Sequence, residues 1–176
     1  MNNIKLVIVN GRPGSGKTTF ETMCKGIMGP YVRTRSTVDK VKSIAMRAGW
    51  DGRKTPEARK LLSDLKDLFT KFNDMPFKDI TSHLGYFKAE LADYGVFDAP
   101  AIFFVDSREP EEIERFKNEL DAVTLLVRRP EVENLETSNH ADANVNNFDY
   151  DYVVENDGTM TDLEDKAKEF INWLFK

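Results

Sequence analysis

The sequence contains very little cysteine and histidine. Its one cysteine, Cys24, excludes an internal disulfide and a cysteine-based zinc site, and its two histidines, His83 and His140, lack metal-ligand spacing. No apolar run reaches the length of about 18 residues that a membrane-spanning helix needs. The first residues lead directly into a strand-like segment, which leaves no room for a signal peptide. These absences predict a cytoplasmic protein without a membrane partner, in which Cys24 packs in the core.

The sequence also lacks an excess of positive charge. Its net charge of −5 over 176 residues makes nucleic acid an unfavoured partner. The charge is unevenly distributed, because residues 31–71 hold eleven Lys or Arg against five acids, whereas residues 131–176 hold three against twelve. The basic stretch could receive a phosphorylated small molecule, or it could be no more than solvated helix faces.

The most specific feature of the sequence is the segment 11–18, which reads GRPGSGKT and fits the phosphate-loop pattern G-x-x-x-x-G-K-S/T. An apolar, β-branched run precedes it, and helical spacing follows it. Strand, glycine-rich loop and helix in this order present inward-facing N–H groups and a helix N-terminus to a polyphosphate. The pattern predicts that Lys17 reaches the β- and γ-phosphates of the bound polyphosphate and that the Thr18 hydroxyl binds Mg²⁺. The expected ATP-binding residues of the loop are Gly11, Pro13, Gly14, Ser15, Gly16, Lys17, Thr18 and Thr19.

The rest of the chain alternates strand and helix patterns. Buried-strand candidates at 101–106, 122–127 and 150–154, and a short strand at 31–35, predict an α/β fold with a parallel sheet covered on both faces. The helix opening at Thr55-Pro56 has the strongest apolar period in the sequence. We expect one domain, with a core formed by residues 1–35 and 96–176, a helical acceptor-binding insertion over about 36–95, and a short lid over about 128–147.

Polar residues follow the predicted strands, at the edge where parallel sheets bind ligands. Asp106 ends an apolar strand and could hold Mg²⁺, or it could cap the next turn. Arg108 could bind an acceptor phosphate, or it could pair with one of the glutamates that follow it. Arg128 and Arg129 could close over the transferring group, or they could be a solvated strand end. We predict Lys17, Asp106, Arg128 and Arg129 as catalytic residues, with Thr18 and Asp106 as metal ligands.

These features together carry a family resemblance. The loop with Pro13 and Thr19, the compact size, the helical insertion and the arginine-bearing segment after Arg128 resemble the nucleoside-monophosphate kinase branch of the P-loop proteins. The chain is most similar to small bacterial and phage (deoxy)nucleoside monophosphate kinase-like proteins. The resemblance implies a three-layer P-loop NTPase fold with sheet order 2-3-1-4-5, a mobile lid, and ATP with Mg²⁺ as cofactors. It also implies an acceptor site at Arg33, Arg35, Ser36, Thr37, Arg59 and Arg108, and nucleotide contacts at Asn156, Asp157 and Gly158.

The sequence therefore favours phosphoryl transfer from ATP to a small phosphorylated acceptor, with a (deoxy)nucleoside monophosphate as the first candidate. Two alternatives stay open: a kinase that acts on a non-nucleotide acceptor, and a nucleotide-binding regulatory ATPase that has no acceptor. A GTPase is disfavoured, because the guanine signature Asn-Lys-x-Asp occurs nowhere in the sequence.

Overall fold

The computed structural model describes residues 3–95, 98–133, 145 and 148–176, and its strands form one parallel sheet. In chain order the strands are β1 (Ile4–Asn10), β2 (Val32–Ser36), β3 (Ala101–Asp106), β4 (Val123–Arg128) and β5 (Tyr152–Glu155). Their order in the sheet is β2-β3-β1-β4-β5, which confirms the order 2-3-1-4-5 and the α/β class. Most of the predicted lid lies outside the described residues.

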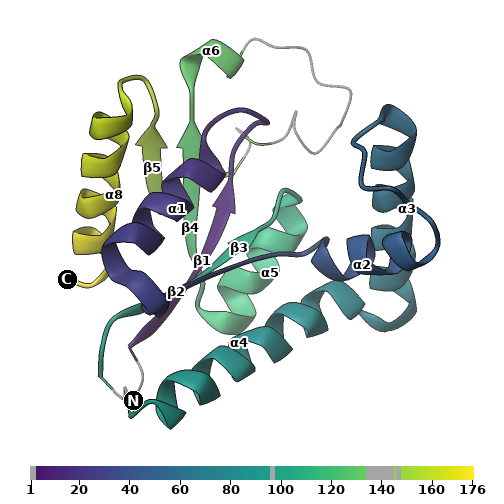
Figure 1. Cartoon of the computed structure of the whole chain (residues 1–176), viewed down its shortest axis with the longest axis horizontal. Helices are drawn as coiled ribbons and strands as arrows, with labels where there is room; N and C mark the ends of the chain where they lie inside the picture. The colour runs from purple at the N-terminus through teal and green to yellow at the C-terminus, as the bar shows by residue number, and fades with distance from the viewer. Residues whose placement is uncertain (1–2, 96–97, 134–144, 146–147) are drawn as a thin grey trace.

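Helices cover both faces of the sheet, so the molecule has three layers (Figure 1). α1 (Lys17–Met28) and α8 (Met160–Leu174) pack on the face that carries Val7 and Val9 of β1. α4 (Met75–Asp93) and α5 (Pro110–Leu120) pack on the other face, against Leu6 and Ile8. This division follows from the alternation of side chains along a strand. Cys24 of α1 is fully buried, as expected of a packing residue.

The helices between β2 and β3 are α2 (Asp39–Arg47), α3 (Pro56–Asn73) and α4. α3 begins as predicted, because the Thr55 side chain accepts a hydrogen bond from the Ala58 N–H and Pro56 occupies the first turn. Asp74 adopts a left-handed conformation between α3 and α4, where its carboxylate binds Arg115. Pro76 lies in the first turn of α4 and therefore does not interrupt the helix.

α3 is largely exposed despite its apolar period. Its apolar stripe is the most periodic in the sequence, yet among its residues only Ala58 is buried, and the Leu68 and Phe72 side chains are 59% and 78% exposed. Figure 1 shows the reason, since α3 stands at the side of the molecule with α2 and α4 and does not cover the sheet. Helical periodicity alone therefore does not place a helix in the core.

The shorter elements and the last helix complete the described chain. η1 (Gly29–Tyr31) leads into β2, and α6 (Pro130–Glu133) follows β4. The last helix is α8, and the side chains of Thr159 and Asp162 form a capping box at its start. Among the helices of the described residues, none combines the length and apolar character needed to cross a membrane.

Candidate functional site

The phosphate loop forms one tight turn between the end of β1 and the start of α1. Gly11, Gly14 and Gly16 have φ angles of 147°, 83° and 96°, which residues with a side chain rarely adopt. A Cβ atom on Gly11 would overlap the carbonyl oxygen of Val127 in β4. The Ser15 N–H donates to the Arg12 carbonyl at 3.1 Å, which closes the turn. The glycines of the motif are therefore required by the backbone path and by the close approach of β4.

Asn10 fixes the start of the loop, a residue that sequence analysis did not select. Its Oδ1 accepts a hydrogen bond from the Gly11 N–H at 2.8 Å, and its Nδ2 donates to the Tyr150 hydroxyl at 2.8 Å. The Tyr150 hydroxyl in turn donates to the Val145 carbonyl at 2.9 Å, and burial raises the pKa of Tyr150 to about 12. The signal that could have identified Asn10 is a buried polar residue at the end of an apolar strand.

The predicted nucleotide-contact turn lies against the other side of the loop. The Asn156 Nδ2 donates to the Ser15 carbonyl at 2.9 Å, and a Cβ atom on Gly16 would overlap that amide group. Asp157 pairs with Lys166 at 2.6 Å, and Gly158 lies against the Asp162 side chain. Asn156 thus supports the loop itself, and a contact of this turn with a base stays a prediction.

Lys17 and Thr18 occupy the first turn of α1. The Lys17 Nζ donates to the carbonyls of Gly11 and Arg12 within the loop, so its charge lies at the centre of the turn. Thr18 is exposed and Thr19 is half-buried. The predicted phosphate-binding residues are therefore brought together in one continuous surface at the N-terminus of a helix, where an anion is favoured.

Two carboxyl groups lie beneath this surface, and only one of them was predicted. Asp106 shares its face of β3 with Ile102 and Phe104, which pack under α1. Glu21 lies on α1, one turn after Lys17, and is 4% exposed; its Oε1 has no hydrogen-bond partner. Burial and the charge of Asp106 raise the pKa of Glu21 to about 8, against the opposing effect of Lys17. Sequence analysis missed Glu21 because its neighbours Phe20 and Cys24 indicate a core-facing surface.

Asp106 has its own pKa raised by burial, while the charges of Lys17 and Arg108 lower it. Its carboxylate and the Thr18 hydroxyl are hard oxygen donors of the kind that Mg²⁺ prefers. Within residues 3–95, 98–133, 145 and 148–176, no group of three or more His, Cys, Asp or Glu side chains could hold a metal ion. The two predicted ligands fit Mg²⁺ chemically, and its other ligands would have to be phosphate oxygens or water.

Two of the predicted acceptor residues lie directly beside Asp106. Ser36 is the register partner of Asp106, and the Thr37 N–H donates to the Asp106 carbonyl at 3.2 Å. The Asp39 carboxylate accepts from the Ser36 N–H at 2.9 Å and fixes the turn into α2. The end of β2 therefore meets the end of β3 next to the predicted metal ligand.

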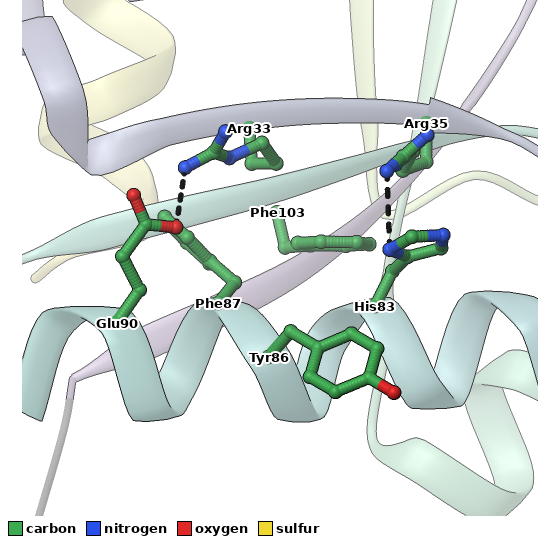
Figure 2. A pocket seen from close by; sticks show the side chains of 7 residues that line it. All are labelled: Arg33, Arg35, His83, Tyr86, Phe87, Glu90 and Phe103. Carbon is green, nitrogen blue, oxygen red and sulfur yellow. Dashed lines mark hydrogen bonds and ion pairs between the residues drawn. The ribbon is translucent and has the colours of Figure 1, made fainter.

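Arg33 and Arg35 lie on the opposite face of the sheet. Figure 2 shows both side chains turned toward α4, where they line a pocket of about 190 Å³ with Phe103 between them. Arg33 pairs with Glu90 at 2.7 Å, and Arg35 contacts the His83 Nδ1 at 3.1 Å. Because alternate residues of a strand face opposite sides, these arginines are separated from the face that carries Asp106. Their acceptor role stays a prediction.

Three of the remaining predicted arginines lie at or after the ends of β3 and β4, and the fourth, Arg59, lies on α3. Arg108 is half-buried next to Asp106, and Arg59 is exposed on α3. Arg128 pairs with Glu155 at 3.5 Å and Arg129 with Glu131 at 2.8 Å; the four side chains are 40–63% exposed. Exposed pairs of this kind contribute about 0–1 kcal/mol, so either arginine could exchange its partner for a phosphate.

Arg12, the unusual charged residue of the loop, lies 3.8 Å from Glu133 of α6. Both side chains are largely buried, at 15% and 18% exposed. This contact joins the phosphate loop to the first residues of the predicted lid segment.

Comparison with known proteins supports the fold. No protein-family model matches the sequence, and a search of curated proteins finds no match either. Among solved structures, a shikimate kinase from Aquifex aeolicus is similar, with 11% identity, a TM-score of 0.51 and 96% of both chains covered. A sugar kinase from Janibacter sp. HTCC2649 has 17% identity and a TM-score of 0.48, over 96% of this chain and 95% of that chain. The likeness to the shikimate kinase confirms the fold expected of a small P-loop kinase, and at this identity it concerns the fold alone.

Proposed function

We propose that this protein is a P-loop kinase that transfers the γ-phosphoryl group of ATP to a small phosphorylated molecule, with a (deoxy)nucleoside monophosphate as the first candidate acceptor. The observation that carries the proposal is the loop of residues 11–18, formed in full and placed next to Asp106. Phosphoryl transfer requires positioning and charge neutralisation more than covalent chemistry, and this arrangement supplies both.

In the proposed reaction Lys17 exchanges the carbonyls of Gly11 and Arg12 for oxygens of the β- and γ-phosphates. Thr18 and Asp106 would hold Mg²⁺, which when bound neutralises charge on the phosphates. Arg128 and Arg129 would leave their surface carboxylates to contact the transferring group. Lys17 acts on charge that develops in the transition state, where a fixed positive group has its largest effect.

The acceptor would lie above the ends of β2 and β3. Ser36 and Thr37 lie there beside Asp106, and Arg108 adds a positive charge close enough to affect the pKa of the Asp106 carboxyl. Arginine suits an acceptor phosphate because its planar group can bind two oxygens at once. A monophosphate placed at this edge would face the phosphate loop across Asp106.

The test is ADP release measured with MgATP across a panel of nucleoside and deoxynucleoside monophosphates, with non-nucleotide phosphates and unphosphorylated sugars as further arms. We expect turnover that depends on one nucleoside monophosphate. Turnover with a sugar or another non-nucleotide acceptor would support the kinase activity and show that the proposed acceptor is wrong. Slow ATP hydrolysis that no acceptor accelerates would contradict the kinase and favour a regulatory ATPase.

A further inference from the structure

The pair formed by buried Glu21 and half-buried Asp106 is not explained by the proposed reaction, which uses only Asp106. Glu21 is 4% exposed, and its Oε1 lacks a hydrogen-bond partner. A buried carboxyl oxygen without a partner is costly, and few native structures keep one without a ligand, a proton or a metal to satisfy it. The pair therefore requires a further group.

Glu21 and Asp106 lie on elements that pack against each other, α1 and β3. Glu21 follows Lys17 by four residues and Thr18 by three, so all three share one face of α1. Asp106 lies on the face of β3 that packs under this helix. The charges of Asp106 and Lys17 both act on Glu21, and the charge of Lys17 acts on Asp106 as well. Two acids and one lysine thus lie close enough to affect one another beneath the loop, and the exposed Thr18 is the next residue of α1 after Lys17.

Three acids, Glu21, Asp106 and Asp39, and three cations, Lys17, Arg108 and Lys42, act on one another here. When Lys17 turns to the phosphates of a nucleotide, as the proposed function requires, Glu21 and Asp106 lose the positive charge that acts on both of them. A divalent cation would neutralise the pair in either state, and oxygen ligands are what Mg²⁺ prefers.

We propose that Glu21, Asp106 and Thr18 together form a Mg²⁺ site that is loaded before the nucleotide binds, with Glu21 contacting the ion directly or through one of its waters. This inference rests on the proposed function for the identity of the metal, and it adds Glu21 to the two ligands that the loop motif implies. When ATP binds, the cation holds Asp106 in place while Lys17 moves to the phosphates.

The experiment is a titration of the nucleotide-free full chain with MgCl₂, followed by calorimetry and by the midpoint of thermal unfolding. Matched additions of NaCl control for ionic strength, and the pH is set above the pKa of Glu21 so that protons compete least. We expect one bound Mg²⁺ per chain and an unfolding midpoint that rises with its concentration, because a ligand that binds only the folded state stabilises it.

Three variants sharpen the result. Glu21→Gln keeps the shape of the side chain and removes its charge, and we expect Mg²⁺ to bind about 10- to 100-fold more weakly, the usual loss when a residue that supports a metal site is changed. Asp106→Asn is expected to abolish the binding. Glu111→Gln, an exposed glutamate on α5, is the matched control and should bind Mg²⁺ as the wild type does.

Two outcomes would overturn the inference: no uptake of Mg²⁺ by the wild type without nucleotide, or equal uptake by the wild type and Glu21→Gln. In either case a shared proton, and not a cation, neutralises the pair. The kinase proposal would survive both, because it is judged separately by acceptor-dependent turnover with MgATP.

Discussion

The phosphate-loop region and the α2–α3 region are held in place by different means. The loop is fixed from both sides by the side chains of Asn10 and Asn156, and by the close packing of Gly11 on β4. α2 and α3 stand at the side of the sheet, with Met46, Leu61, Leu68 and Phe72 exposed. The proposed donor half is thus positioned before any ligand binds, whereas the proposed acceptor half depends on a few contacts at its edge.

One of those contacts connects α3 to the segment that follows Asp106. Lys66 of α3 pairs with Glu112 of α5 at 2.8 Å, and both side chains are about 85% buried, at 14% and 15% exposed. Glu112 also accepts from the hydroxyl of Ser107, the residue that follows Asp106. A movement of α3 would therefore shift Glu112 and, through it, Ser107 at the end of β3. The comparison of the two regions indicates that the most firmly fixed part of the site is the loop proposed to bind phosphate.

The sharpest test of this contrast compares two phenylalanines. Phe20→Ala in α1 removes a fully buried ring that packs on Phe170, and we expect it to lower the free energy of unfolding by about 3–5 kcal/mol. Phe72→Ala in α3 removes a ring that is 78% exposed, and we expect a change within about 0.5 kcal/mol. Urea unfolding followed by circular dichroism measures both. A large loss for Phe72→Ala would mean that α3 is covered, for example by a second copy of the chain.

Removal of the loop lysine tests the donor half directly. We expect Lys17→Ala to lower kcat about 100- to 1,000-fold, because a positive group aimed at developing charge contributes most in the transition state. Lys25→Ala, at the exposed end of the same helix, is the control and should keep normal turnover. The measurement is ADP release at saturating ATP and acceptor. Near-normal turnover of Lys17→Ala would contradict the role assigned to the loop.

The two regions also differ in how much of their structure could be predicted from the sequence. The loop and the strands follow from local signals, namely the spacing of the glycines, the β-branched runs and the alternation of elements, whereas the order of the strands was implied by the family resemblance. Glu21 was missed, since a single acid on a core-facing helix surface has no local signature. The exposure of α3 does not follow from its sequence, because periodicity indicates an apolar face and not what covers it. Arg33 and Arg35 were grouped with Ser36 by resemblance, and only strand alternation separates them.

The buried acid pair predicts an unusual pH dependence of stability without Mg²⁺. The pKa of Glu21 is about 8 in the folded chain against 4.5 in the unfolded one, so between these values the folded state holds a proton that the unfolded state has released. Stability should therefore fall as the pH rises from 4.5 to 8. Glu21→Gln removes this loss, and we expect it to be about 1–3 kcal/mol more stable than the wild type near pH 8.

Denaturant unfolding of the two proteins at several pH values makes this measurement. Below pH 4.5 the difference should vanish, because the glutamic acid is then neutral in both states. A constant difference at every pH would mean that the carboxyl group of Glu21 does not titrate in this window, and that the pair is neutralised by another group.

The smallest expected effect separates two arginines of the acceptor half. Arg108→Ala should raise the KM of the acceptor about tenfold, since it removes one charge-assisted contact worth about 1.4 kcal/mol, while the KM of ATP changes little. Arg33→Ala should leave the KM of the acceptor within about twofold, because that side chain faces α4 and its pair with Glu90 is exposed. Initial rates over a range of acceptor concentrations distinguish the two variants. If Arg33→Ala raised the KM as much as Arg108→Ala, the acceptor would reach around the open edge of β2 into the pocket beside α4, and the site would extend over both faces of the sheet.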